Sequence, residues 1–120
     1  MAFDPYQFYE IGSKLLDDQN YDIPGGYRTS VSRLYYASFL FVRKFIEQAG
    51  ISIAQDHLQH EEIIVLLTEK YSHLGNQLRK LRDYRNDADY LLFSNISKAT
   101  VRNCLKMAEQ ILTSDIDFTQ

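Results

Sequence analysis

The sequence predicts an all-α fold, namely an up-and-down four-helix bundle with one additional short helix. Apolar residues recur at three- and four-residue spacing in five segments, and no segment carries the alternating pattern of a strand. The connections between these segments are short, which favours antiparallel neighbours. We expect residues 1–120 to form a single domain, with its core in residues 5–112 and a frayed tail in residues 113–120.

The first helix is predicted over residues 5–18. Asp4 is suited to cap it, and Pro5 is suited to the first helical position. The segment 21–27 contains Pro24, Gly25 and Gly26, so we expect a turn-rich connector there.

The segment 28–49 is expected to be the central helix. A surface helix needs an apolar stripe of about 100°, whereas the apolar residues of this segment cover more than half of the helical wheel. Neighbours must therefore contact it on two or three sides. Gly50 is expected to end it.

Three more helices complete the prediction. Asp56 and Gln59 resemble a capping box at the start of a helix that ends near Tyr71. Gly75-Asn76 should break the pattern before a fourth helix, whose apolar stripe consists of Leu74, Leu78, Leu81, Ala88 and Leu92. Ser97 is the expected cap of the last helix, whose apolar face consists of Val101, Cys104, Leu105, Ala108, Ile111 and Leu112.

Composition narrows the class of protein. The chain lacks an apolar run near the roughly 20 residues that span a bilayer, and its N-terminus lacks the pattern of a signal peptide, so we expect a cytoplasmic protein away from membranes. A net charge of −3 argues against a broad nucleic-acid surface, and no DNA partner is expected, although a local basic site stays open. Cys104 is the single cysteine and is expected to be a small core residue.

A polar cluster interrupts the fourth predicted helix. Arg85 lies inside its apolar stripe, and Asp89 follows four residues later as an ion-pair partner. Asn86 and Tyr90 form a second pair at the same spacing, with Arg82 beside them. An unpaired buried charge costs several kcal/mol, so Arg85 must be paired or solvated in a cleft.

Two interpretations of this cluster stay open on spacing alone. In the first, Arg85 and Asp89 form a structural ion pair that also bonds Tyr35 or Tyr36 of the central helix. In the second, the cluster holds a phosphodiester or a nucleotide, because the arginine fork suits phosphate. Arg28 is a further candidate to line the same cleft, as is Arg33.

The chain resembles the HEPN superfamily (higher eukaryotes and prokaryotes nucleotide-binding), in particular its small stand-alone bacterial and archaeal members. The residues that carry the resemblance are SVSRLYYASFLFVRKFIEQAG at 30–50, His60 and LRKLRDYRNDADY at 78–90, and the likeness covers residues 28–112. The resemblance implies an all-α bundle that dimerises, with one motif helix from each protomer at a shared cleft. It also implies a metal-independent ribonuclease, often a toxin paired with a minimal nucleotidyltransferase antitoxin.

The family motif is an arginine, often followed by a polar residue, with a histidine four to six residues after the arginine. Arg85 and Asn86 match its first two positions, but Tyr90 stands where a histidine could follow. RNA cleavage without a metal needs a group that accepts the 2′-hydroxyl proton, and a tyrosine with an ordinary pKa near 10 is a poor base. The departure puts nuclease activity in doubt.

The histidines do not form a convincing metal site. His57 and His60 lie three residues apart, but no third ligand follows at a fixed spacing, so we expect neither a metal nor another cofactor. His60 is expected to pack near the motif helix, and a role as a displaced motif histidine stays an alternative.

Two hypotheses follow. One is an interaction module, a homodimer that is non-catalytic or weakly active, binds RNA or a nucleotide and associates with a nucleotidyltransferase partner. The other is an active metal-independent endoribonuclease toxin, with Arg85, Asn86 and Tyr90 as catalytic residues in a composite dimer site. Its binding residues would be Arg82, Asp89, Arg28, Tyr35, Tyr36 and His60. The absent histidine favours the first hypothesis.

Overall fold

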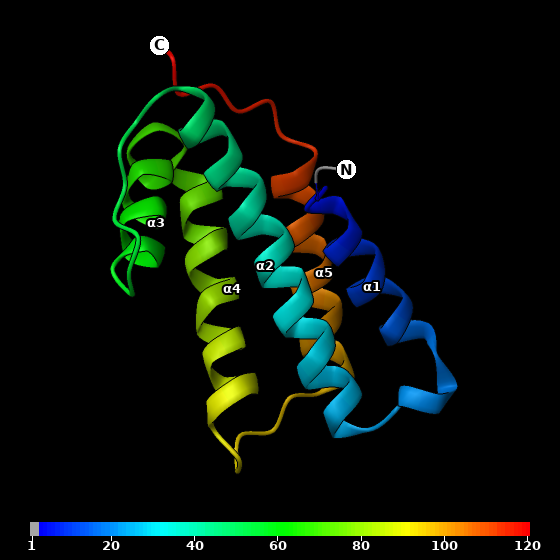
Figure 1. The fold of residues 1–120 in the computed structure, drawn as a ribbon. Helices are drawn as coiled ribbons and strands as arrows, with labels where there is room; N and C mark the ends of the chain where they lie inside the picture. The colour runs from blue at the N-terminus through cyan, green and yellow to red at the C-terminus, as the bar shows by residue number, and fades with distance from the viewer. Residues whose placement is uncertain (1–2) are drawn as a thin grey trace.

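A computed structural model describes residues 3–120 as five helices, with no strand in that range. They are α1 (Tyr6–Asp17), α2 (Pro24–Gln48), α3 (Gln59–Lys70), α4 (Ser72–Tyr90) and α5 (Lys98–Leu112), and a 3-10 turn η1 (Gln19–Tyr21) follows α1. Figure 1 shows α1, α2, α4 and α5 running up and down as a bundle, with the shorter α3 beside the N-terminal part of α4. The predicted all-α bundle with one additional short helix is confirmed.

Helix α2 is the centre of the bundle. It contacts each of the other four helices, and Leu34 and Tyr35 are among its fully buried side chains. Figure 1 shows α2 between α1 and α4. The wide apolar surface read from the sequence is thus covered on several sides. None of the helices in residues 3–120 combines the length and the apolar character needed to span a membrane.

The start of α2 differs from the prediction. The helix begins at Pro24, so residues 24–27 of the expected connector lie in its first turn, whereas residues 21–23 precede it. Proline is tolerated there because the first helical N–H groups have no partner inside the helix. A Cβ on Gly26 would overlap the carbonyl oxygen of Tyr21, which explains the glycine by close packing rather than by a turn. Gly50, with φ +73°, ends the helix region as predicted.

The predicted break at Gly75-Asn76 is wrong. The chain turns at the single residue Tyr71, which has φ −134° and ψ 77°, and α4 already begins at Ser72. Gly75 lies inside α4 against α3, where a Cβ would overlap the Oγ1 of Thr68 and lie 2.5 Å from its Cα. The glycine allows two helices to approach closely.

The predicted capping box at Asp56 is only half formed. The Asp56 carboxylate accepts a hydrogen bond from the N–H of Leu58 at 3.0 Å. The Gln59 side chain instead donates to the carbonyl oxygen of Ala54 at 2.8 Å, while Glu62 accepts from the Ala54 N–H at 2.9 Å. These two side chains hold the loop before α3, and buried Ile53 anchors it to the core.

The last helix follows the prediction closely, whereas the tail does not. Ser97 caps α5 by accepting the N–H of Thr100 at 3.1 Å, and Cys104 is buried. Burial raises the pKa of the Cys104 thiol to about 12, which keeps it protonated. The predicted fraying of the tail is wrong, because Ile116 is buried and the N–H of Asp117 donates to the Tyr71 hydroxyl at 2.9 Å.

The end of α4 exposes Leu92, which the sequence pattern assigned to the apolar stripe of this helix. The helix stops at Tyr90, so Leu92 falls outside it and is 86% exposed. Phe93 is fully exposed in the same turn. A helical wheel could not foresee this, because the register of the wheel is lost where the helix ends.

Candidate functional site

Arg85 lies in α4 and faces α2, with only 14% of its side chain exposed. Its Nε is 2.8 Å from the Oδ2 of Asp89, which confirms the predicted i,i+4 pair. The N–H of Nε does not point at that oxygen, so the contact is an ion pair without an aligned hydrogen bond. The Asp89 carboxylate also accepts from the Ser32 hydroxyl at 3.4 Å.

The other guanidinium nitrogens of Arg85 bond to three neighbours. Nη2 donates to the hydroxyl of Tyr36 at 2.7 Å and to that of Tyr90 at 3.2 Å. Nη1 donates to the Oδ1 of Asn86 at 3.1 Å. A guanidinium has five N–H groups, so within residues 3–120 two of them form no hydrogen bond, namely the buried N–H of Nε and one N–H on Nη1.

Aromatic rings also surround this cation. The Cζ of Arg85 lies 5.0 Å from the ring centre of Tyr36, 5.2 Å from that of Tyr90 and 5.9 Å from that of Tyr35. Such contacts are electrostatically favourable, the more so where water is excluded. Tyr90 is 67% exposed, so its ring covers the cation from the solvent side.

The two adjacent tyrosines of α2 have different roles. Tyr35 is fully buried, and its hydroxyl lies 2.5 Å from the Nδ1 of His60. Burial raises the pKa of Tyr35 well above its usual value, which keeps the hydroxyl protonated. Tyr36 points to Arg85 instead. The sequence predicted that at most one of the pair faces the core, and this is confirmed.

His60 lies in α3 at the edge of the cluster. Its ring stacks on Phe39 with centroids 4.3 Å apart, and its centroid is 6.1 Å from that of Tyr36. Burial, followed by the positive charges of Arg82 and Arg85, lowers the pKa of His60 below its ordinary 6.5. The imidazole is therefore neutral near pH 7, with Nδ1 already bonded to Tyr35.

Protonation of His60 is expected to weaken the fold. Because its pKa is lowered in the folded state, the unfolded chain binds a proton first as the pH falls. The contribution of His60 to the unfolding free energy should therefore be fully present above about pH 6.5, and the unfolding free energy should decrease as the pH falls below that value. Urea unfolding between about pH 5 and pH 8 measures this slope. His60→Gln should flatten it, whereas substitution of the exposed His73 should not. Equal slopes in both variants would contradict the account.

Two of the predicted site residues, Arg82 and Arg28, lie outside the hydrogen-bond network of Arg85. Arg82 lies one turn before Arg85 and bonds to Glu61 at 3.1 Å, so it borders the cluster without joining its hydrogen bonds. Arg28 donates to the carbonyl oxygens of Ala88 at 2.8 Å and Ser94 at 2.5 Å. Its guanidinium thus holds the end of α4, which corrects the expectation that Arg28 lines the Arg85 cleft.

Two neighbours of the cluster, Ser32 and Phe39, were not predicted from the sequence, whereas Arg33 was a predicted candidate for the cleft. Ser32 reaches Asp89, Phe39 supports His60, and Arg33 lies over the rings of Phe8 and Tyr36 at 4.7 Å and 5.8 Å. Positions 32, 36 and 39 of α2 are spaced by four and three residues, so helical periodicity places them on one face. That spacing was the available signal.

The arrangement is suited to recognising an anion. Arg85 supplies charge and a free N–H, and Asn86 and Tyr90 supply polar groups at the more exposed side. No metal-ligand cluster of three His, Cys, Asp or Glu side chains occurs within the described part of the chain, residues 3–120.

Comparisons with known proteins give one match. The family model of the HEPN domain matches residues 7–116. No significant match was found among curated proteins or among solved structures. Since the matched segment spans nearly all of the 120 residues, this chain belongs to the HEPN domain family.

Proposed function

We propose that the protein is a cytoplasmic, dimeric HEPN module that binds RNA or a nucleotide at the Arg85 cluster. In this proposal it is a non-catalytic or weakly active component of a toxin–antitoxin type system with a minimal nucleotidyltransferase. The observation that carries the proposal is the state of Arg85, a largely buried cation with an undonated N–H on Nη1 and an exposed partner, Tyr90. The membership of the HEPN family supports it.

The surroundings of Arg85 favour binding over cleavage. Metal-independent cleavage needs a base within hydrogen-bond reach of the 2′-hydroxyl. Tyr90 occupies the motif position, and its hydroxyl oxygen is already engaged by a hydrogen bond from the Arg85 cation. His60 is neutral but bonds through Nδ1 to Tyr35, which leaves only Nε2 for a ligand.

His60 supports a second candidate function, an active endoribonuclease. Its ring lies beside Tyr36, the residue that bonds Arg85, so a substrate bound at Arg85 would have an imidazole nearby. In that mechanism Arg85 stabilises the charge of the phosphorane, Asn86 orients the phosphate, and His60 takes the place of the missing motif histidine.

Incubation of structured RNA with the purified protein in EDTA separates the two candidates. We expect binding without cleavage. Cleavage by the wild type that is lost in Arg85→Ala and kept in Arg79→Ala would establish the nuclease instead. Arg79 is the matched control because it is an exposed arginine of the same helix, paired with Glu61.

The dimer has its own test. We expect a homodimer in which the Arg85 clusters of two chains contribute to one cleft, with the exposed apolar residues after α4 near the contact. Sedimentation at tens of micromolar measures the mass directly, and a strictly monomeric species would remove the composite cleft. A nucleotidyltransferase gene beside this one would support the proposed partner.

A further inference from the structure

We infer that a partly exposed face of α2 continues the Arg85 site as a track for single-stranded RNA. We define the α2 track as Arg33, Tyr36, Leu40, Arg43 and Lys44, together with Phe3 beside them. The inference rests on the proposed function, because Arg85 would bind one end of the same strand.

The α2 track is continuous along the helix. Positions 33, 36, 40 and 44 are separated by three or four residues, so they share one face. At a rise of 1.5 Å per residue this face extends about 16 Å. One end of it is tied to Arg85, since the Tyr36 hydroxyl accepts a hydrogen bond from Arg85 at 2.7 Å.

The charges of the α2 track are available to a polyanion. Within residues 3–120, neither Arg33 nor Lys44 has a carboxylate within ion-pair distance. Arg43 is paired with Glu47 at 2.7 Å. Although the chain as a whole carries a net charge of −3, this face therefore presents two free cations in addition to the Arg85 site. A phosphate backbone matches that local charge.

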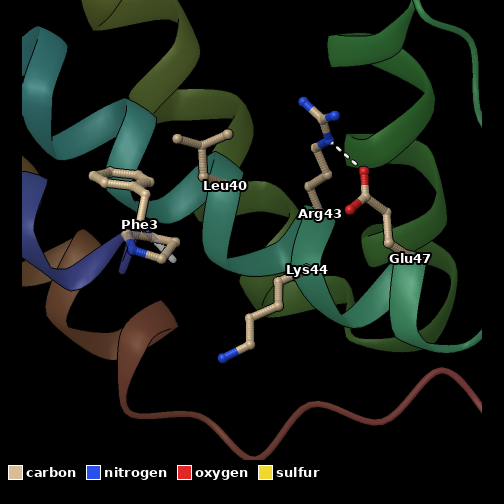
Figure 2. Close-up of a pocket in the computed structure, with 6 residues that line it drawn as sticks. Phe3, Leu40, Arg43, Lys44 and Glu47 are labelled. Carbon is tan, nitrogen blue, oxygen red and sulfur yellow. Dashed lines mark hydrogen bonds and ion pairs between the residues drawn. The ribbon is translucent and has the colours of Figure 1, made fainter. Parts of the chain in front are cut away.

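A hollow at the far end of the α2 track can receive a base. It has a volume of about 250 Å³ and is lined by Phe3, Pro5, Leu40, Arg43, Lys44 and Glu47. Figure 2 shows Phe3 and Leu40 on one side, the Arg43–Glu47 pair on the other and the Lys44 side chain extending away from that pair. Phe3 is 49% exposed, so its ring offers a stacking surface at this end.

A second aromatic ring connects the two ends. Phe8 of α1 lies 4.7 Å from Phe3 between ring centres, and the Arg33 guanidinium lies 4.7 Å above the Phe8 ring. Cations that alternate with aromatic rings are the pattern that binds single strands with little sequence preference. Of the rings here, Phe3 is exposed, whereas Phe8 and Tyr36 are half-buried. A duplex stacks its bases internally and would leave the ring of Phe3 unused.

The test measures the affinity of a labelled single-stranded RNA of about ten nucleotides by fluorescence anisotropy at several salt concentrations. The double variant Arg33→Gln/Lys44→Gln should weaken binding about tenfold and reduce the salt slope by about 1.4, as expected for the loss of two contacts to a single strand. Binding of a dinucleotide, which occupies only the Arg85 site, should be unchanged in Lys44→Gln, because Lys44 lies at the far hollow of the α2 track.

A matched control removes two positive charges from another part of the surface. Lys80 and Lys106 line a separate groove between α4 and α5, so Lys80→Gln/Lys106→Gln alters the net charge equally and should leave the affinity unchanged. Equal effects of the two double variants would overturn the α2 track. Lys44→Gln alone, at an exposed position, repeats the test if the double variant unfolds.

Failure of the α2 track can be told apart from failure of the proposed function. If Arg85→Gln abolishes binding while Arg33→Gln/Lys44→Gln does not weaken it, only the α2 track is overturned. If the wild type binds the dinucleotide but not the longer RNA, only the α2 track is overturned, and if it binds neither, both fail. If Arg33→Gln/Lys44→Gln changes the sedimenting mass instead of the RNA affinity, the face is a contact between two copies and the RNA assignment is overturned.

Discussion

Gly75→Ala is expected to destabilise the protein by about 2–3 kcal/mol, a typical result of forcing a group into a filled space. The new Cβ would overlap the Thr68 side chain and lie 2.5 Å from the Thr68 Cα. Because a backbone atom cannot rotate away, α3 and α4 must separate. In an open helix the same substitution normally stabilises, since alanine has the higher helix propensity. A loss of stability in Gly75→Ala would therefore show that α3 and α4 are in close contact at this position.

Urea unfolding measures this change, and Gly25→Ala is its control. Gly25 lies in the first turn of α2, and no atom lies within 4 Å of the position that an alanine Cβ would take. Alanine there should leave stability unchanged or raise it by up to about 1 kcal/mol. If both variants unfold at the same urea concentration, the close approach of α3 and α4 at Gly75 is contradicted.

Arg28→Met is expected to cost about 2–3 kcal/mol, the range for hydrogen bonds to a charged group together with a cation at a helix C-terminus. Arg28 donates to the carbonyl oxygens of Asp87 and Ala88 in the last turn of α4, and to those of Leu92 and Ser94 in the turn that follows. Methionine keeps much of the apolar side chain but none of these bonds.

Hydrogen exchange locates the effect of Arg28→Met. Exchange at the amides of Leu91 and Ser94, both hydrogen-bonded in this turn, should accelerate more than exchange in the buried core of α2. Arg28→Lys keeps the charge but cannot form the fork, so it should recover only part of the stability. An Arg28→Met variant with wild-type stability and exchange would contradict the capping role.

The sequence was informative where local chemistry decides structure. The apolar wheel of α2, the Ser97 cap and the Arg85–Asp89 spacing each depend on residues within one helix, and the structure contains all three. The prediction at Gly75 failed because a glycine that breaks a helix and a glycine that permits close packing look identical in sequence. Only the position of Thr68 on another helix separates the two cases.

The surroundings of Arg85 were partly predictable for the same reason. Asn86, Asp89 and Tyr90 lie within five residues of it, so helical spacing brings them together. The choice of Tyr36 rather than Tyr35 depends on how α2 packs against α4. The role of Arg28 depends on the end of α4 and the turn after it, 59 to 66 residues later, and no periodicity in the sequence encodes it.

The central claim is that Arg85 contacts the ligand. The most direct measurement is the NMR resonance of the Arg85 Nε–H, assigned with an Arg85→Lys variant and followed while single-stranded RNA is added. The account predicts that this resonance shifts as RNA binds, because the ion pair with Asp89 and the bond to Tyr90 must rearrange. RNA that binds while the resonance stays unchanged would contradict it.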